Sequence, residues 1–460
     1  MRTIAALVLG LALTTPVLAR LPVLVGDALC VSQSDGPFLA LSTEARDAYL
    51  AALADAGWRC LRIDFTWSRI QPAPPPAPFD FSRYDELVDQ AAAHGIRLTG
   101  ILDYSVDWAA AAAPPGDDRY PPDDPATFAT FAGETAARYR ERVEAWEVWN
   151  EPNNSLSGFW KPVPDPGGYA RLAKAAAAAI TRADRKAKIV TGGLAPTFDL
   201  LVYQRDWGFF TAASEAERRW FRRFDAAALH PYSYLQAAPP EQENPPLGPS
   251  VPHQIRDFRD RLTESHATRL PLWVTELGWH TAPDSGFPGF PPGVSELDQA
   301  RFLVRATVLA LAQSVERVCW YTLLDYPSFL TNKEDAFGLF HYTPTPTATT
   351  LDPKPAYQAA KTLAALLGPL RFSKDSRIAF NLPPEGYAFQ FRRKKPAQTI
   401  VVYWATRDGL IVHARVAGNV KRVQRVELDG TTTDLGTLDV VDIPLTASPV
   451  YLVFDGFTVP

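Results

Sequence analysis

Cysteine and methionine are scarce in this 460-residue chain, which contains three Cys and one Met. An odd number of cysteines leaves at least one unpaired, which excludes a scaffold held together by disulfides. The spacing of Cys30, Cys60 and Cys319 matches no zinc-binding pattern. Because each cysteine lies in or beside an apolar, strand-like run, we expect buried and unreactive thiols at all three positions.

An excess of charge of one sign is also missing. The formal net charge is −5, acidic and basic residues are mixed along the chain, and no basic stripe stands out. Nucleic acid is therefore not an expected partner.

Long hydrophobic runs are missing beyond the amino terminus. Residues 4–13 form one short apolar run, which is too short to span a bilayer as a helix of the mature protein. Arg2 precedes the run, and Val17-Leu18-Ala19 fits a small-residue cleavage site, so we predict a signal peptide over residues 1–19. The mature protein is then secreted or periplasmic and free of the membrane. A buried amino-terminal helix is the alternative, but the position and the following Arg20-Leu21-Pro22 argue against it.

Aromatic residues and proline are plentiful. Hydrophobic residues make up 47% of the chain, which excludes general disorder, and aromatic residues make up 12%, with 12 Trp. Such a content suits a sugar-binding cleft, although many of these rings will be core. The 42 Pro residues, often in doublets, indicate long and stiffened surface loops.

Strand-like and helix-like segments alternate from about residue 22 to residue 365. Eight strand-then-helix units predict an α/β fold, a (β/α)8 TIM barrel over residues 20–366. The predicted strands cover residues 23–30, 60–65, 96–103, 143–150, 188–194, 226–230, 272–276 and 318–323. The predicted helices cover residues 43–55, 82–94, 126–140, 169–183, 215–224, 252–266, 296–314 and 355–366. Ser42-Thr43 and Ser82-x-x-Asp85 supply helix start signals, and Gly95 supplies a stop signal.

The remaining residues, about 367–460, lose helical periodicity. Short alternating runs at 387–392, 399–405, 411–416, 422–428 and 450–454, separated by turn signals, predict a small antiparallel β-sandwich. It has no dense polar cluster, so we assign it a packing role. Sugar binding is the alternative and rests on fold analogy alone.

Two glutamates with unusual neighbours carry the functional interpretation. Glu151 lies in Trp149-Asn150-Glu151-Pro152 and Glu276 lies in Trp273-Val274-Thr275-Glu276-Leu277-Gly278-Trp279. Each follows or ends a predicted barrel strand, the fourth and the seventh, and active sites of such barrels lie where strands end. Two opposed carboxylates are what glycosidic bond cleavage requires, and aromatic faces bind sugar rings.

Several other polar and aromatic residues are candidates for the same rim. Arg62 is a charged residue inside an apolar strand and can hold one carboxylate ionised; an interior ion pair with Asp64 or Glu147 is the alternative. His230 and Tyr232 follow the sixth strand and can orient the nucleophile. A satisfied loop histidine is the alternative, but the position of both residues at the rim favours the site role. The candidate aromatic residues are Trp320 or Tyr321 as a floor, and Trp108 and Trp160 as stacking rings or ordinary core.

The chain resembles the clan A glycoside hydrolases through Asn150-Glu151-Pro152 and through Glu276 in its Thr-Glu-Leu-Gly setting. It is most similar to family 39 through three longer strings, and families 5 and 79 share parts of them. The strings are Trp146-Glu147-Val148-Trp149-Asn150-Glu151-Pro152-Asn153, Ala228-Leu229-His230-Pro231-Tyr232 and Trp320-Tyr321-Thr322-Leu323-Leu324-Asp325. The closing Ser448-Pro449-Val450-Tyr451-Leu452 is similar to the end of that family's β-sandwich.

This resemblance implies a role for each matching residue. Glu151 is then the acid/base and Glu276 the nucleophile of a retaining enzyme, with Asn150 bound to the sugar 2-hydroxyl. Arg62, His230 and Tyr232 orient the nucleophile, and Trp320, or else Tyr321, is the aromatic floor. Double displacement needs no metal and no cofactor.

The sequence therefore predicts an exported, monomeric glycoside hydrolase that cuts β-linked polysaccharide within the chain. An exo-acting enzyme similar to β-xylosidases is the first alternative. A non-catalytic sugar-binding barrel is the second, and the presence of both glutamates and Asn150 argues against it. A purely structural barrel leaves the two Trp-flanked acids unexplained.

Overall fold

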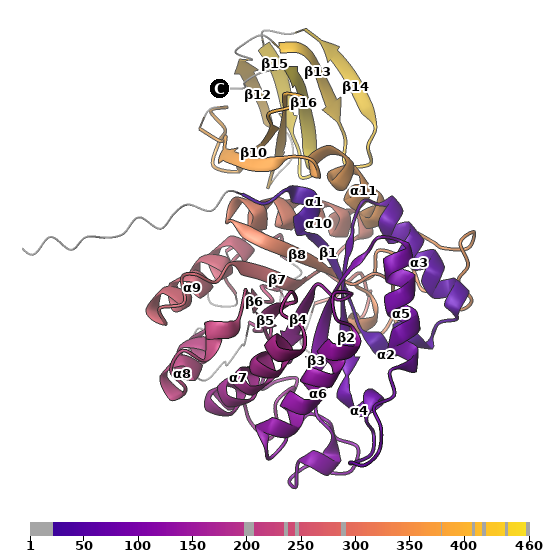
Figure 1. The fold of residues 1–460 in the computed structure, drawn as a ribbon. Coiled ribbons are helices and arrows are strands. Elements are labelled where there is room, and N and C mark those ends of the chain that lie inside the picture. The colour runs from indigo at the N-terminus through magenta and orange to yellow at the C-terminus, as the bar shows by residue number, and fades with distance from the viewer. Residues whose placement is uncertain are drawn as a thin grey trace, which may run out of the picture.

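The computed structural model describes residues 22–196, 207–233, 238–243, 248–286, 291–378, 380–406, 410–415, 420–437 and 440–456. The predicted signal peptide and its cleavage site lie outside these residues. Figure 1 shows a strand-and-helix barrel with a second, all-β unit stacked on one side of it. Among the described residues, no helix is both long and apolar enough to cross a membrane.

The eight strands of the first unit run parallel in the ring order β5-β4-β3-β2-β1-β8-β7-β6. Parallel bridges from Val190 to Ala226 and from Leu194 to Leu229 join β5 to β6 and close the ring. The predicted TIM barrel is therefore confirmed. The strands are β1 Leu29–Gln33, β2 Cys60–Thr66, β3 Arg97–Asp103, β4 Ala145–Val148, β5 Lys188–Thr191, β6 Ala227–Leu229, β7 Leu272–Leu277 and β8 Val315–Tyr321.

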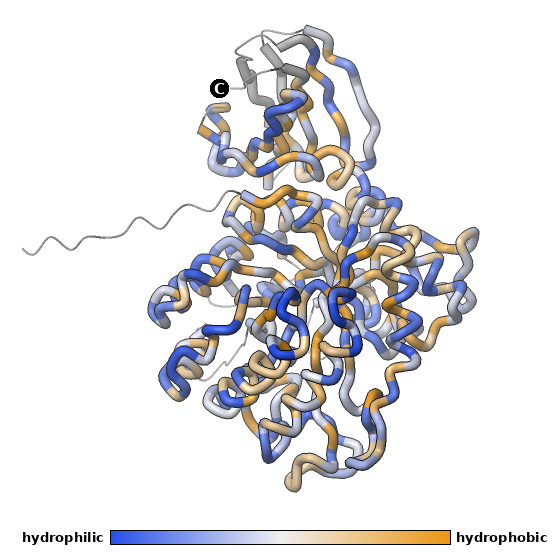
Figure 2. Tube along the Cα trace, viewed as in Figure 1, coloured by the Kyte–Doolittle hydropathy of each residue, from blue (hydrophilic) through white to orange (hydrophobic). Residues whose placement is uncertain are grey.

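Side chains alternate between the barrel interior and the surrounding helices. Arg317 of β8 donates to Thr99 of β3 across the interior, with 2.9 Å between Nη1 and Oγ1. Leu61, Ile63 and Phe65 of β2 belong to the large core cluster shared with the helices. Figure 2 shows hydrophobic stretches in the central strands and mixed hydropathy along the outer helices. Arg62 and Asp64 thus share the inner face of β2.

Helices cover the outside of the barrel. They are α1 Val25–Ala28, α2 Asp35–Ala40, α3 Thr43–Asp55, α4 Trp67–Ile70, α5 Ser82–Ala93, α6 Pro125–Arg138, α7 Pro166–Ala183, α8 Gly208–Ala216, α9 Val251–Glu264, α10 Glu296–Ala312 and α11 Pro355–Leu367, with short 3-10 turns η1 Asp107–Ala109, η2 Trp220–Arg223 and η4 Lys333–Asp335. The Ser42 side chain caps α3 as predicted, accepting from the backbone of Ala45 at 3.2 Å. Ser82 is instead the first helical residue of α5, whose cap position is Phe81 and has no side-chain cap.

Two predicted elements differ from the structure. The first predicted strand begins with α1, and β1 starts only at Leu29. The helix predicted over 215–224 is the end of α8 followed by η2, because Arg219 adopts a left-handed conformation with φ of 57° between them. A non-glycine residue with positive φ cannot continue a right-handed helix.

The carboxy-terminal unit is the predicted antiparallel β-sandwich. Six strands pair in the order β14-β13-β16-β11-β10-β9, and β12 pairs with β15 in a second sheet. The strands are β9 Arg371–Asp375, β10 Gly386–Arg393, β11 Gln398–Ala405, β12 Leu410–Arg415, β13 Val420–Val426, β14 Thr432–Gly436, β15 Val440–Leu445 and β16 Val450–Gly456. One of the turn signals between the predicted runs, Arg407-Asp408-Gly409, lies outside the described residues. Strands β9, β14 and β15 escaped the sequence analysis; β9 and β14 carry mostly exposed or half-buried residues, which weakens the apolar alternation.

The sandwich is tied to the barrel by polar contacts of α10. Arg301 donates to Ser448 at 2.8 Å, and Arg305 donates to the carbonyl oxygen of Ala447 at 3.4 Å. Arg305 also pairs with Glu241, which accepts a 2.9 Å hydrogen bond from Nε1 of Trp404 in β11.

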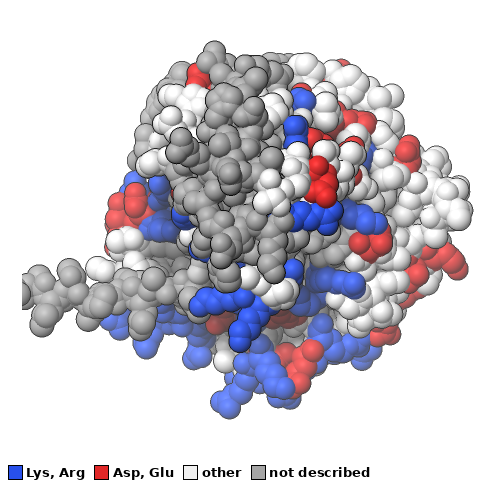
Figure 3. Space-filling model, turned by 90° about the horizontal axis from the view of Figure 1, so that it is seen from above, with Lys and Arg blue, Asp and Glu red and all other residues white. Residues whose placement is uncertain are grey.

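Figure 3, a view from above, shows Lys and Arg side chains gathered along one edge, with Asp and Glu side chains among them.

The cysteine prediction is wrong for two of the three residues. Cys30 and Cys60 form a disulfide between β1 and β2, whereas Cys319 is free and buried as expected. All three sulfur atoms belong to one buried cluster because β8, β1 and β2 are neighbours in the barrel. Sequence spacing carried no sign of this proximity, which depends on the register of adjacent strands.

Candidate active site

Glu151 and Glu276 lie beside each other at the carboxyl end of the barrel. Glu151 follows β4 by three residues, and Glu276 is the penultimate residue of β7. One oxygen of Glu151, one nitrogen of His230 and one oxygen of Glu276 lie within 4.8 Å of one another. The structure therefore brings together the two acids that the sequence analysis singled out.

Glu276 is surrounded by hydrogen-bond donors. Nη1 of Arg62 lies 2.6 Å from Oε1, and the Tyr232 hydroxyl donates to Oε2 at 2.9 Å. Burial by itself raises the pKa of Glu276, but the electrostatic effects of His230 and Arg62, with these two hydrogen bonds, outweigh it. The pKa of Glu276 is thus lower than usual, and the carboxylate stays ionised.

Arg62 lies at the centre of the interior network and makes both contacts that the sequence left open. Nε and Nη2 bind the two oxygens of Glu147 at 2.7 and 2.9 Å, while Nη1 binds Glu276. The same guanidinium reaches Ser32 at 2.9 Å and Asn150 at 3.1 Å. Burial acts to lower the pKa of Arg62, but the charges of Glu147 and Glu276 raise it well above its usual value.

Glu151 has a different set of partners. Asn154 donates to Oε2 at 2.6 Å, and Nδ1 of His230 lies 2.8 Å from Oε1. His230 is thus hydrogen-bonded to Glu151, while its separation from Oε2 of Glu276 is 3.8 Å. We expected His230 to orient Glu276, but the hydrogen bond of His230 is made to Glu151 instead.

The backbone around Glu151 is held in an uncommon conformation. Trp149 and Glu151 have φ values of 69° and 44°, in the left-handed region that side-chain-bearing residues seldom occupy. The amide of Glu151 donates to the carbonyl of Gly193 at 3.1 Å, and the Asn153 side chain bonds both backbone groups of Ala195. Such strained residues persist where neighbours over-determine them, and they cluster at functional sites.

Gly193 makes room for His230. A Cβ atom at position 193 would lie 2.0 Å from Nε2 of His230, a distance that no side chain tolerates. The ring is also fixed by Thr275, whose hydroxyl lies 3.0 Å from Nε2 and donates onward to Glu147 at 3.2 Å. His230 is consequently locked between the two acids.

The aromatic candidates divide into two groups. Tyr321 is half-buried and lies 6.5 Å, ring centre to ring centre, from Tyr232, so it belongs to the site. Trp320 faces the helices, is 2% exposed and stacks on Trp279, so the structure does not bring it to the acids. Trp160 is core, packed on Trp149 and Tyr169. Trp108 packs on Trp67 and donates to the carbonyl of Gln71, away from both acids' hydrogen-bond partners.

Sequence reasoning missed two polar residues of the site. Tyr104 follows β3 and accepts from Nδ2 of Asn150 at 3.1 Å, and its ring stacks on Phe159. Its place immediately after a barrel strand was a usable signal. Asn154, in contrast, reaches Glu151 only because the loop after β4 folds back, and its spacing gives no such sign.

The cluster of Glu151, His230 and Glu276 has the size of a metal site, but its oxygens are already engaged. Arg62 and Tyr232 occupy the two oxygens of Glu276, and Asn154 and His230 occupy those of Glu151. Carboxylates that accept a guanidinium and an amide are arranged for acid and nucleophile chemistry rather than for cation ligation.

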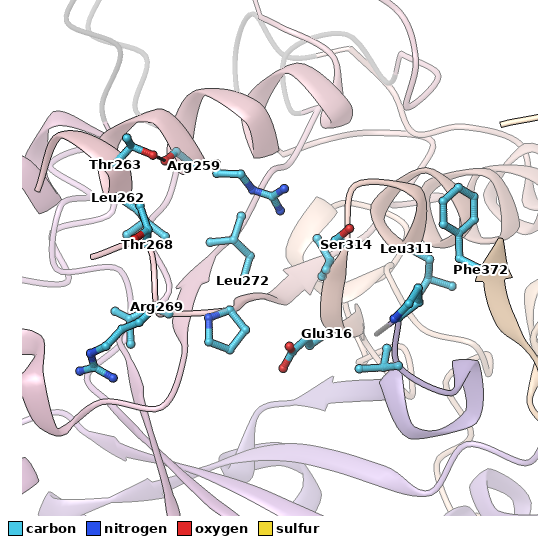
Figure 4. Close-up of a pocket in the computed structure, with 15 residues that line it drawn as sticks. Arg259, Leu262, Thr263, Thr268, Arg269, Leu272, Leu311, Ser314, Glu316 and Phe372 are labelled. Carbon is cyan, nitrogen blue, oxygen red and sulfur yellow. Dashed lines mark hydrogen bonds between the residues drawn. The ribbon is translucent and has the colours of Figure 1, made fainter. Parts of the chain in front are cut away.

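A pocket of about 390 Å³ lies at the opposite end of the barrel (Figure 4). It includes Leu272 and Val315, the first residues of β7 and β8, together with Phe372 of β9. Its arginines are occupied by backbone carbonyls, Arg259 by Gln313 at 2.6 Å and Arg269 by Phe221 at 2.7 Å. Active sites of such barrels form at the other end, so this pocket is not the candidate site.

A closed parallel barrel with two facing glutamates at the carboxyl ends of β4 and β7 defines the class of protein, a glycoside hydrolase. Comparison with known sequences then gives the family. Residues 32–284, more than half of the chain, match the cellulase family, glycosyl hydrolase family 5, and the chain belongs to that family. The predicted membership of the clan A glycoside hydrolases is thereby confirmed.

Known relatives extend this result. A 112-residue stretch is 33% identical to a 6-phospho-beta-glucosidase of Dickeya chrysanthemi and covers 23% of each chain, so the chain spans less than a quarter of that relative's length. A family 39 glycoside hydrolase from Bacteroides cellulosilyticus WH2 superposes with a TM-score of 0.70 at 19% identity, covering 94% of this chain and 82% of the other. A monomeric β-xylosidase from Caulobacter crescentus CB15 superposes with a TM-score of 0.64 at 17% identity, covering 95% and 98%. The fold is thus that of family 39 enzymes.

Proposed function

We propose that the protein hydrolyses β-glycosidic bonds of a polysaccharide with retention of configuration. The observation that carries this proposal is the spacing of the acids, whose nearest oxygens lie within 4.8 Å. Retaining enzymes hold their carboxyl groups about 5 Å apart, whereas inverting enzymes need roughly 6.5–9.5 Å to admit a water molecule.

The environments of the acids support separate roles. Glu276, kept ionised by Arg62 and Tyr232, attacks the anomeric carbon while Glu151 gives its proton to the departing glycosidic oxygen. The products of this step are a glycosyl ester on Glu276 and the free leaving-group sugar. Asn154 and His230 then stabilise the Glu151 carboxylate, which removes a proton from water. The resulting hydroxide attacks the anomeric carbon and releases Glu276.

Asn150 is suited to bind the 2-hydroxyl of the sugar that is attacked. Its side chain is fixed by Arg62, which donates to Oδ1 at 3.1 Å, and by Tyr104, which accepts from Nδ2. A contact that strengthens as the ring flattens lowers the barrier without tightening substrate binding.

The proposal has three further parts. The enzyme cuts within the polysaccharide chain, it acts outside the cell, and it is a monomer. Endo action is supported by the match to the cellulase family. Exo action is favoured by the likeness to the Caulobacter β-xylosidase and is the second candidate. Product length after brief digestion separates them, since endo action releases mixed oligosaccharides and exo action releases one sugar.

The decisive test uses Glu276→Ala and Glu151→Ala. Each should lower hydrolysis of β-glycans or aryl β-glycosides by several orders of magnitude with the fold intact by circular dichroism. Azide should restore turnover of Glu276→Ala and yield a glycosyl azide of inverted configuration, because the anion replaces the missing nucleophile. Near-normal turnover of Glu276→Ala contradicts the assigned roles.

A further inference from the structure

A second group of acids, which the proposed mechanism does not use, lies where β1, β2 and β3 reach the barrel mouth. Asp64 is two residues beyond Arg62 in β2 and therefore points to the interior, one layer nearer the rim. Asp103 ends β3 and pairs in register with Thr66, so it shares that interior face. Asp35 follows β1, and its amide donates to Asp64 at 3.1 Å.

These acids differ in how well their oxygens are satisfied. Asp35 accepts from the hydroxyls of Tyr84 and Thr66 and lies 3.4 Å from Arg69. Asp103 is 1% exposed, and neither of its oxygens has a hydrogen-bond donor among the described residues. A buried carboxyl group without partners is costly, so it calls for a proton, a water molecule or a ligand group to satisfy it.

If all three carboxyl groups were ionised, their negative charge would exceed what the described residues compensate. Burial, followed by the charges of Asp64 and Asp35, raises the pKa of Asp103 well above its usual range. Burial, followed by the charge of Asp35, raises the pKa of Asp64 to about 7. The positive charge of Arg62 lowers the pKa of both Asp64 and Asp103, but Arg62 is already paired with Glu147 and Glu276.

The arrangement of these carboxyl groups decides among three kinds of ligand: a metal ion, a sugar hydroxyl and an ammonium group. A metal ion needs several ligand atoms close together, and among the described residues that arrangement occurs at Glu151, His230 and Glu276 but not at these aspartates. A sugar hydroxyl donates a hydrogen bond but brings no positive charge. An ammonium group supplies three donors and a full charge.

We propose that Asp64 and Asp103 bind the ammonium group of an amino sugar, so that the natural substrate is a β-linked glycan with free, unacetylated amines. This inference rests on the proposed function, since it names the substrate of the same site. Asp64 is half-buried and lies two residues beyond Arg62 on the inner face of β2, and Arg62 binds Glu276, so the ammonium lies beside the sugar under attack.

The test compares kcat/KM for 4-nitrophenyl β-glucoside with that for the analogues carrying a free amine at carbon 2, 3, 4 or 6, and for their N-acetyl forms. At least one free amine should exceed both the parent glucoside and its own N-acetyl form tenfold or more. A panel in which no amine is preferred overturns the inference.

Isosteric variants locate the effect. Asp64→Asn and Asp103→Asn should each lower kcat/KM for the preferred amine at least tenfold and for the neutral glucoside less than threefold. The control is Asp89→Asn, which alters an exposed carboxylate on α5 that pairs with Arg142. It should change kcat/KM for neither substrate. Equal losses on both substrates overturn the inference, and Asp64→Asn decides alone if Asp103→Asn does not fold.

The outcomes also separate this inference from the proposed function. Hydrolysis of the neutral glucoside that vanishes in Glu276→Ala supports the proposed function even when no amine is preferred. A wild-type protein that hydrolyses neither these glycosides nor any of the β-glycans overturns both.

Discussion

Arg62 and Glu276 are joined by a 2.6 Å hydrogen bond although 214 positions separate them in the sequence. The same guanidinium holds Glu147 with two further bonds, so one cation from β2 binds acids from β4 and β7. Arginine suits this task because its planar fork stays charged and offers several fixed donors. The interior of the barrel and the candidate site are consequently a single network.

Removal of Arg62 should damage stability as well as activity. Arg62→Ala leaves Glu147, which is 0% exposed, as a buried charge without a counter-ion. We expect a loss of about 3–5 kcal/mol in the free energy of unfolding, measured by urea denaturation. Arg138→Ala, which breaks an exposed pair with Asp85, is the control and should be nearly neutral. Equal stability of the two variants contradicts this account of Arg62.

Loss of the Tyr232 hydroxyl should shift the pH profile of hydrolysis. Tyr232→Phe removes a donor that helps to keep the pKa of Glu276 low. The acidic limb of kcat/KM against pH should therefore move to higher pH, because Glu276 then takes up a proton more readily. A hydrogen bond to a charged group contributes about 1.5–3 kcal/mol, so kcat/KM at the optimum should fall roughly 10–100-fold. An unchanged acidic limb sinks the assignment.

Asp64 should make the protein less stable as pH rises. Burial raises its folded-state pKa to about 7, above the value of about 4 expected in the unfolded chain. Between these values the folded state binds the extra proton, so stability falls with increasing pH by at most about 1.4 kcal/mol per unit. Urea denaturation from pH 5 to pH 7 should show this slope in the wild type and a flatter one in Asp64→Asn. Parallel curves for the two proteins exclude the effect.

The contact between Glu241 and Arg305 should stabilise the junction of the two units. Both side chains are at most 3% exposed, and Trp404 of the sandwich donates to the same carboxylate. Glu241→Ala leaves Arg305 buried without its partner, for an expected cost of about 3–5 kcal/mol. Glu241→Gln keeps an acceptor and should cost less. Limited proteolysis and urea denaturation measure both, and identical behaviour of the two variants counts against the network.

Periodicity and strand-end rules were sufficient for the fold and the acids. Parallel strands buried on both faces leave continuous apolar runs, and glutamates at the ends of the fourth and seventh runs stand out against them. The predicted strand 272–276 and helix 43–55 lie within one residue of β7 and α3. Periodicity failed where tertiary contacts decide the conformation, as at Arg219 between α8 and η2.

The direction of side chains was the main limit of the sequence analysis. Trp320 and Tyr321 are adjacent and equally aromatic, yet alternation turns Tyr321 to the interior and Trp320 to the helices. The disulfide between Cys30 and Cys60 depends on the register of β1 against β2, which an isolated sequence does not specify. The contact of Asn154 with Glu151 depends on a loop path in the same way.

The absence of a side chain at position 193 restricts how this lineage can diversify. Any replacement there collides with the imidazole of His230, so the glycine cannot be exchanged while the histidine stays in place. A descendant that loses the histidine is released from this restriction and can accept an alanine or serine. The two positions should therefore drift as a pair, which makes them a simple marker for sorting distant homologues into those that keep this arrangement and those that have abandoned it.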